Sequence, residues 1–394
     1  MHILITTSWY PTDKSTNGVF VKEQGEALCR AGHSVTVLLI TYSTLSGWFR
    51  QSRLQFDKSA LLNVVHLHIF FPLPGRFFKN ASAYFKRTII KRANRWMKKY
   101  VTENGKPDII HHHCLSDNAY VTEALASEFK IPYVFTEHSN YFTYEELNKF
   151  NSFETFEDHK RFVQHAAERI GVSEIRANGY SKIFGVPFIV VSNMVQELFE
   201  TPLASQKKSD FFTFVCVAIL DKRKRQDLLI RAFATAFKDQ PVRLLLVGNG
   251  HMETSYRQLA DELGISKQVE FSGKQNRENV KRIFDEAHVA VLSSDQETFG
   301  VVLAEAMFRG IPVISTICGG PEEVVTPFTG LLCPKGDEVA LADVMQKMKI
   351  HYKDYLPDEI RMYAQSRFSE EIILKKLELI YNRCINKRNK RIFI

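Results

Sequence analysis

Two carboxylates, Glu297 and Glu305, stand eight positions apart around the start of an apolar segment. The run 289–292 (VAVL) is short, apolar and partly β-branched, as expected of a buried parallel strand. A polar loop follows it, and the run 301–307 has the composition of an apolar helix. The local order is therefore strand, loop and helix, with one carboxylate in the loop and the other one turn into the helix.

The start of this helix offers hydrogen-bond donors to an anion. The first backbone N–H groups of a helix have no intrahelical partner and lie at the positive end of its dipole. The amides of Phe299, Gly300 and Val301 could thus bind a diphosphate, because the glycine allows close approach. Glu305 has the acceptor lone pairs to bind a ribose diol, and Glu297 would face the sugar. In isolation, Glu297 would be read as an acidic residue that stabilises the helix dipole, and Glu305 as an ordinary exposed glutamate.

Two further motifs follow the carboxylate pair, namely 310–314 (GIPVI) and 319–323 (GGPEE). In this order, E-x7-E, G-x-P-V-I and GG-x-x-E resemble the C-terminal half of retaining GT-B glycosyltransferases of family 4. The resemblance implies an α/β fold with two Rossmann-like domains that face a central cleft. It also implies a C-terminal helix that crosses back to the N-terminal domain.

Composition is that of an ordinary globular protein, with 394 residues and 45% hydrophobic content, enough for two domains. Lys and Arg number 52 against 44 Asp and Glu, and this net charge of +8 favours an anionic partner. On charge alone that partner could be nucleic acid, anionic lipid or a nucleotide sugar. The six cysteines are scattered singly, and neither a signal peptide nor a long apolar run is evident, so we expect a reduced, cytoplasmic setting.

Strand-like runs alternate with helical stretches, which predicts parallel sheets with helices on both faces. The polar stretch 201–210 interrupts the alternation and is predicted to link two domains. We expect an N-terminal acceptor-binding domain at 1–196, with a returning helix at about 370–394, and a C-terminal nucleotide-sugar-binding domain at 197–369. The expected strands are 2–6, 34–40, 64–69, 108–112, 133–136, 169–172, 188–191, 212–218, 243–247, 269–271, 289–292 and 313–315.

Two residues of the N-terminal half are candidates for the same site. Gly18 resembles the glycine of the loop after the first strand in this family, which approaches the donor phosphates; alone, it would be a turn residue. His138 follows the strand at 133–136, and the resemblance implies that it touches the donor sugar, although a single histidine there is often structural. The run 111–113 (HHH) is a poor metal site, because consecutive side chains near a strand end point in alternating directions.

A basic cluster at 220–227 resembles the family segment that holds the diphosphate with an arginine and a lysine. Lys224 matches the lysine, whereas the arginine falls on Ile219 and a usual glycine falls on Arg225. Arg223 or Arg225 could replace the lost arginine; otherwise the cluster is a solvated charged surface. In the second half Gly248, in the turn Val-Gly-Asn-Gly, could also approach the donor.

No metal or other cofactor is expected. The chain contains no Asp-x-Asp motif, so helix amides and Lys224 would take the place of a bridging metal ion. A G-x-G-x-x-G dinucleotide fingerprint is also missing from the first loop.

The segment 76–99 is basic and aromatic and contains no Asp or Glu. It is predicted to contact an anionic membrane surface, since each basic residue near such a surface contributes on the order of 1 kcal/mol. The alternative is an ordinary surface helix with a buried aromatic face; RNA binding is not expected. The residues concerned, with two flanking aromatics, are Phe70, Phe71, Arg76, Phe77, Phe78, Lys79, Tyr84, Phe85, Lys86, Arg87, Lys91, Arg92, Arg95, Trp96, Lys98 and Lys99.

Together these features predict a metal-independent hexosyltransferase, which the resemblance implies to be retaining. We expect it to transfer sugar from a nucleoside diphosphate donor, with UDP preferred over GDP, to a glycan or lipid-linked acceptor in cell-surface polysaccharide synthesis. It would act in the cytoplasm or at the inner face of the plasma membrane. One alternative is a non-catalytic nucleotide-sugar-binding or membrane scaffold protein, which is favoured because Ile219 replaces the family arginine. Another is a sugar-nucleotide epimerase with the GT-B fold.

Overall fold

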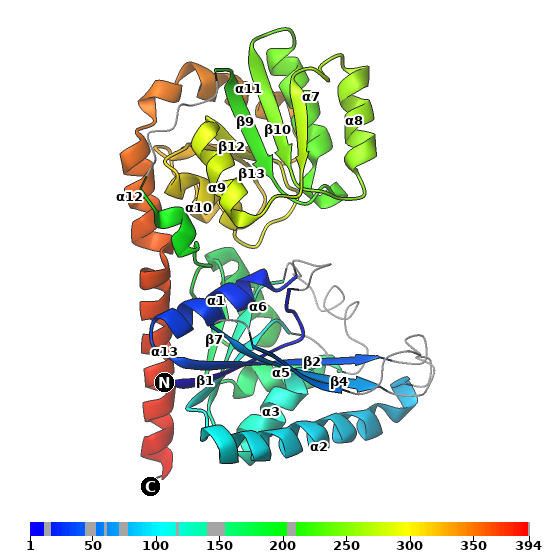
Figure 1. Ribbon diagram of the computed structural model, residues 1–394, viewed down its shortest axis with the longest axis vertical. Helices are drawn as coiled ribbons and strands as arrows, with labels where there is room; N and C mark the ends of the chain where they lie inside the picture. The colour runs from blue at the N-terminus through cyan, green and yellow to red at the C-terminus, as the bar shows by residue number, and fades with distance from the viewer. Residues whose placement is uncertain are drawn as a thin grey trace. The chain divides into compact units, whose positions relative to one another are not determined.

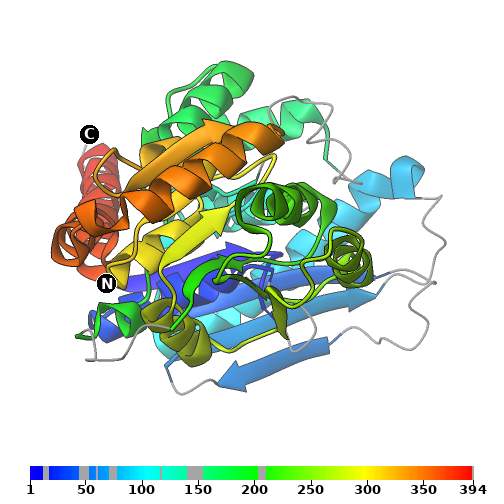
Figure 2. The same ribbon diagram turned by 90° about the horizontal axis from the view of Figure 1, so that it is seen from above.

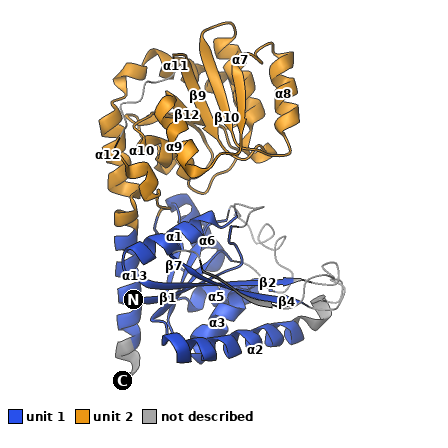
Figure 3. Cartoon of the chain, viewed as in Figure 1, with its two compact units in different colours: residues 1–191, 374–394 blue, residues 192–373 orange. Residues whose placement is uncertain are grey.

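The chain forms two compact units. Unit 1 comprises Met1–Val191 and Leu374–Ile394, and unit 2 comprises Ser192–Ile373 (Figure 3). Sequence analysis placed the corresponding boundaries at 196/197 and 369/370. This computed structural model describes residues 1–11, 17–43, 53–58, 61–70, 78–115, 118–139, 154–202 and 210–392.

Unit 1 contains an eight-stranded sheet in the order β3-β4-β2-β1-β5-β6-β7-β8. In Figure 1, α1 lies on one face of this sheet and α2 and α3 lie on the other. The elements are β1 (His2–Thr7), α1 (Val19–Arg30), β2 (Ser34–Ser43), β3 (Arg53–Lys58), β4 (Asn63–Phe70), α2 (Phe78–Asn104), β5 (Ile109–His113), α3 (Ala119–Glu128), β6 (Tyr133–Glu137), α5 (Phe156–His165), β7 (Glu168–Gly171), α6 (Glu174–Phe184) and β8 (Ile189–Val190).

The prediction of a wholly parallel sheet is wrong at one edge of unit 1. β3 was not predicted, and it pairs with β4 in the antiparallel direction (Figure 2). The connection from Lys58 to Asn63 is short, whereas a parallel neighbour needs a crossover of a dozen or more residues. The charged composition of 53–58 (RLQFDK) gave no apolar run by which to recognise a buried strand.

Unit 2 contains a six-stranded, wholly parallel sheet in the order β11-β10-β9-β12-β13-β14. β14 was missed, because GLLCP is short and ends in proline. Helices α7 and α11 lie side by side on this sheet (Figure 2). The elements are η3 (Glu197–Glu200), β9 (Phe212–Val217), η4 (Lys222–Lys224), α7 (Gln226–Phe237), β10 (Val242–Val247), α8 (Glu253–Glu262), β11 (Val269–Gly273), α9 (Arg277–Glu286), β12 (Val289–Leu292), α10 (Val301–Phe308), β13 (Val313–Ile317), η5 (Pro321–Glu323), β14 (Gly330–Pro334), α11 (Glu338–Ile350), η6 (Tyr352–Asp354) and α12 (Pro357–Phe368).

The last helix, α13 (Glu370–Ile392), returns to unit 1 from Leu374 onward, as expected of the C-terminal helix. Leu377 and Tyr381 are buried on its apolar face, one turn apart. Tyr381 Oη lies 2.6 Å from Nδ1 of His111 in β5, and Glu378 Oε1 lies 2.8 Å from Nε2 of His33. α13 is therefore fastened to the N-terminal sheet by packing and by hydrogen bonds.

Helix α2 carries the predicted basic segment, and its aromatic residues require a correction. Phe85 and Trp96 are buried in the core of unit 1, so they are not available to a membrane interface. Tyr84 is 67% exposed, and the basic residues Arg87, Lys91, Arg92, Arg95, Lys98 and Lys99 are exposed as well. Phe71, Arg76 and Phe77 lie outside the described residues. Among the helices described here, none is long and apolar enough to cross a membrane.

Candidate functional site

The order of strands in unit 2 brings two distant loops together. β9 and β12 are parallel neighbours, although about seventy residues separate them in the chain. β9 is also the point where the strand order reverses, and ligands of open α/β sheets bind outside the carboxyl ends of strands at such a point. The loop after β9 carries Lys224, and the loop after β12 carries Glu297.

Lys224 and Glu297 form an ion pair, with Nζ 2.5 Å from Oε1. Asp221 positions the lysine, because its side chain accepts hydrogen bonds from the amides of Arg223 and Lys224 and so caps η4. Ser294 Oγ donates to the same Glu297 oxygen at 2.6 Å. The sequence predicted Lys224 and Glu297 for one site, and the structure places their side chains in direct contact; Asp221 and Ser294 were missed.

The two arginines proposed to replace the one lost at Ile219 differ in their surroundings. Arg223 donates from Nη2 to Asp221 at 2.8 Å, and its side chain is 70% exposed. Arg225 donates to Asp227 at 3.1 Å and to Asp295 at 3.2 Å, so it joins the loop that carries Glu297. Its backbone has φ 51°, a left-handed conformation that suits the glycine usual there in the family.

Helix α10 begins at Val301, as predicted, and Gly300 precedes it with φ 85°. Phe299 is buried against Phe368, which fixes the Phe-Gly step. A Cβ on Gly320 would lie 2.3 Å from the amide nitrogen of Phe299, so the GGPEE turn packs directly on the helix start. Among the described residues, none accepts a hydrogen bond from the amides of Phe299, Gly300 or Val301. These donors point to the anion-binding end of a helix.

Glu305 is 1% exposed, and its Oε1 accepts a hydrogen bond from Arg277 Nη2 at 2.5 Å. Arg277 is the first residue of α9, and its Nε also donates to Gln196 Oε1 at 3.1 Å. Sequence reasoning missed Arg277, because a lone arginine after the helix cap Asn276 carries no signal of its partner. The carboxylate predicted to bind ribose is thus oriented by a cation from a neighbouring helix.

Gly248 is required by packing within unit 2. Its φ is 140°, and a Cβ there would meet the carbonyl oxygen of Ala218 at 1.9 Å. The β10 turn therefore lies against the loop that leads from β9 to Lys224. This close contact accounts for the glycine whether or not the turn also approaches a donor.

In unit 1, Gly18 and His138 belong to loops at the carboxyl ends of β1 and β6. Gly18 has φ 77°, and a Cβ would meet the carbonyl oxygen of Trp9 at 2.3 Å. The ring of Phe20, two residues later, stacks on His138 with 3.9 Å between centroids. Buried Glu137 accepts hydrogen bonds from the amide of His138, through Oε1, and from that of Leu115, through Oε2. The structure thus brings the glycine loop and His138 together and fixes the histidine backbone.

A hydrogen-bond chain sets the tautomer of His138. Gln24 Nε2 lies 3.4 Å from His113 Nε2 and 3.2 Å from His111 Nδ1. Because this amide nitrogen only donates, the facing imidazole nitrogens accept, and neutral His113 carries its proton on Nδ1. That nitrogen lies 3.1 Å from His138 Nε2, which therefore accepts, so that neutral His138 is protonated on Nδ1. Sequence gave no sign of this role for Gln24.

The three consecutive histidines are structural partners of the sheet. Burial lowers the pKa of His111 and of His112 to about 3, and it lowers the pKa of His113 well below its ordinary value. His112 Nδ1 lies 3.0 Å from Thr6 Oγ1. Within the described part of the chain, His, Cys, Asp and Glu side chains form no group of three that could hold a metal ion.

Two Rossmann-like α/β units, each with candidate residues at the carboxyl ends of its strands, define a nucleotide-sugar-binding class of fold. The family described as Glycosyltransferase Family 4 matches residues 18–197, and the family described as Glycosyl transferases group 1 matches residues 200–366. The chain therefore belongs to the group 1 and family 4 glycosyltransferases.

Some curated relatives are similar to only part of this chain, and others to nearly all of it. N-acetyl-alpha-D-glucosaminyl L-malate synthase of Bacillus anthracis is 34% identical over 165 residues, which cover 41% of this chain and 42% of the relative. Similarity thus spans less than half the length of that relative. An uncharacterised glycosyltransferase of Methanocaldococcus jannaschii is 22% identical over 97% of this chain and 98% of its own.

Solved structures confirm the GT-B fold. Sucrose-phosphate synthase from Thermosynechococcus elongatus superposes with a TM-score of 0.75 and 21% identity, covering 98% of this chain and 100% of that one. Anabaena HepE in complex with UDP gives a TM-score of 0.69 and 17% identity over 97% of this chain and 100% of its own.

Proposed function

We propose that this protein is a retaining, metal-independent hexosyltransferase that uses a nucleoside diphosphate sugar. Its acceptor would be a glycan or a lipid-linked glycan of a cell-surface polysaccharide. The observation that carries the proposal is the Lys224–Glu297 ion pair in the loops beside the start of α10. A cation, a carboxylate and uncommitted helix amides suit a diphosphate attached to a sugar.

Each part of this arrangement has a role in the proposed transfer. The amides at the start of α10 and the ammonium of Lys224 would bind the diphosphate and offset the charge that develops as it leaves. Glu297, held by Lys224 and Ser294, would position the sugar, and Glu305 would bind the ribose. His138 would contact the donor sugar, as the family resemblance implies. Family membership supports retention, with the departing phosphate helping to take the acceptor proton.

UDP is the nucleoside diphosphate that we propose for the donor, in preference to GDP. Structures of HepE contain UDP, as does one of TarM from S. aureus, whereas a relative from Corynebacterium glutamicum is named for GDP-mannose and a solved starch synthase contains ADP. The exposed basic residues of α2 support docking on the inner face of an anionic membrane, which suits a lipid-linked acceptor.

Thermal unfolding with UDP, GDP and ADP tests the donor site. A nucleotide at about 100 times its Kd adds roughly 2.7 kcal/mol of stability. We expect UDP to raise the melting temperature most, and Lys224→Met to remove most of that rise. Lys222→Met is the matched control, because Lys222 is an exposed lysine of the same turn. Equal responses of the two variants would refute the assigned role of Lys224.

A non-catalytic nucleotide-sugar sensor or scaffold is the second candidate. Its support is Ile219, which stands at the family arginine position and is 51% exposed. Single-turnover release of nucleoside diphosphate in the presence of acceptor separates the two functions. The transferase proposal expects release that Glu297→Gln slows by at least tenfold while nucleotide binding persists. Nucleotide binding without release under any acceptor condition would favour the sensor.

A further inference from the structure

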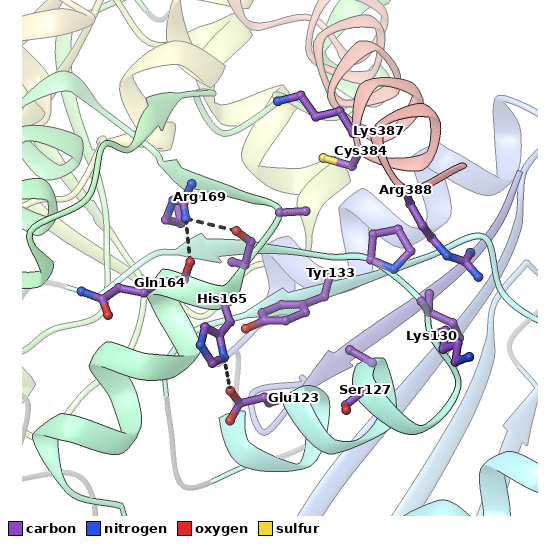
Figure 4. A pocket seen from close by; sticks show the side chains of 15 residues that line it. Glu123, Ser127, Lys130, Tyr133, Gln164, His165, Arg169, Cys384, Lys387 and Arg388 are labelled. Carbon is purple, nitrogen blue, oxygen red and sulfur yellow. Dashed lines mark hydrogen bonds and ion pairs between the residues drawn. The ribbon is translucent and has the colours of Figure 1, made fainter. Parts of the chain in front are cut away.

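A cavity of about 970 Å³ lies at the amino ends of β6 and β7 in unit 1 (Figure 4). Side chains of α3, α5 and α13 line it, together with the loops that lead into the two strands. β6 is five residues long, so about 16 Å of strand separates the cavity from His138 at the carboxyl end. The cavity is thus distinct from the candidate site of unit 1.

Cations dominate the charged groups that line this cavity. The lining includes four cationic side chains but only one carboxylate, that of Glu123. The cations are Lys130, Arg169, Lys387 and Arg388. Figure 4 shows Lys130 and Arg388 on one side, whereas the side chain of Lys387, the residue before Arg388 on α13, points in another direction. An excess of positive charge in a concave surface raises the local concentration of anions.

Two of the lining charges already have partners in the fold. Glu123 accepts hydrogen bonds from His165 Nδ1 at 2.8 Å and from Arg161 Nε at 3.3 Å. Arg169 donates from Nη1 to the carbonyl of Ala166 at 3.1 Å and to two other carbonyls at the end of α5. These contacts hold the wall of the cavity and neutralise its carboxylate.

The other three cations are not compensated in this way. Within the described residues, no ion pair includes Lys130, Lys387 or Arg388. Lys106 adds to the group: its pKa is lowered by partial burial and then by the nearby charges of Arg388 and Lys130. Like charges held together repel one another, and an anion that binds among them removes this repulsion.

We propose that this cavity binds a phosphate-bearing ligand through Lys130, Lys387 and Arg388. Lysine and arginine are the usual partners of phosphate oxygens, and the volume is that of a small-molecule site. Ile131 and Pro132 add an apolar wall for a non-polar part of the ligand. The phosphate belongs either to a soluble metabolite or to a phospholipid headgroup. Since α13 supplies two of the cations and Lys130 lies in the loop between α3 and β6, the bound ligand would join α13 to that loop.

Titration of the full chain with pyrophosphate, monitored by calorimetry, tests the site. All proteins compared in this titration also carry Lys224→Met, so that binding at the proposed diphosphate site of unit 2 is weakened equally in each of them. The pocket variant is Lys130→Gln with Arg388→Gln, and the control is Lys375→Gln with Lys376→Gln, two exposed residues of α13 that do not line the cavity. Both variants lose the same net charge. We expect a Kd below about 1 mM for wild type and control, and a Kd at least tenfold weaker for the pocket variant.

The stability of the variants gives an independent readout. Without ligand, the pocket variant should unfold at a temperature no lower than the control, because it loses mutual repulsion. Equal pyrophosphate affinities in the two variants, or no binding by the wild type, would overturn the proposal. Neither measurement depends on transferase activity.

Vesicle sedimentation identifies the source of the phosphate. Phosphatidylcholine vesicles with and without phosphatidylglycerol are compared for wild type, pocket variant and control. If the wild type and the control bind the anionic vesicles and the pocket variant does not, the ligand is a lipid headgroup. Equal vesicle binding in all three proteins, with pyrophosphate affinity lost in the pocket variant, assigns it to a soluble ligand.

Discussion

Glu305→Ala separates donor binding from folding in unit 2. The carboxylate is 1% exposed, and its hydrogen bond from Arg277 is 2.5 Å long. The substitution removes an ionic hydrogen bond within the fold and also the group assigned to the ribose. These two losses should have different sizes and should be visible in different measurements.

The loss of folding stability follows from the exposure of the pair. Breaking a fully buried ion pair costs about 3–5 kcal/mol, and breaking an exposed one costs at most about 1 kcal/mol. The side chain of Arg277 is 37% exposed, while that of Glu305 is buried, so we expect an intermediate loss of about 2 kcal/mol. A hydrogen bond between a charged carboxylate and the ribose contributes about 1.5–3 kcal/mol, which predicts a Kd weaker by roughly 10- to 100-fold.

The assay pairs urea unfolding with calorimetric titration of UDP. Arg277→Gln is the control, because it breaks the same ion pair and leaves the carboxylate of Glu305 in place. We expect both variants to lose stability, but only Glu305→Ala to lose most of its affinity for UDP. If the two variants weaken binding by the same factor, the carboxylate acts through the fold and its assignment to the ribose is refuted.

Three further predictions concern the backbone and buried imidazoles. Gly18→Ala should lower the unfolding free energy by about 2 kcal/mol or more, whereas Gly32→Ala, with φ 84° and open space around it, should lose only about 1 kcal/mol; urea unfolding compares them. Arg225→Gly should be about 1 kcal/mol more stable than Arg225→Ala, since both lose the side chain but only glycine accepts φ 51° without strain. Burial lowers the folded-state pKa of His111 and His112 to about 3, so the unfolded chain binds more protons between about pH 6.5 and 3, and stability should fall as pH falls through that window. Between pH 7.5 and pH 5.5 the free energy of unfolding should decrease less for His112→Gln than for the wild type. An equal decrease in both proteins would contradict the lowered pKa of His112.

Most of the architecture could be predicted from periodicity. Apolar runs identified twelve strands, because parallel strands buried on both faces are continuous and hydrophobic. The start of α10 could be located as well, since the Phe-Gly step and the apolar run after it are local features. β3 and β14 escaped prediction, because RLQFDK carries charged residues and GLLCP is short and ends in proline.

The sequence by itself determined the class of fold, the candidate carboxylates and Lys224, because these depend on local patterns and on motif order. Tertiary structure alone decided which groups meet. The parallel pairing of β9 with β12 brings Lys224 onto Glu297, and the packing of α9 beside α10 provides Arg277 for its carboxylate partner. Contacts of this kind depend on which strands and helices are neighbours in space, and sequence spacing carries no record of that adjacency.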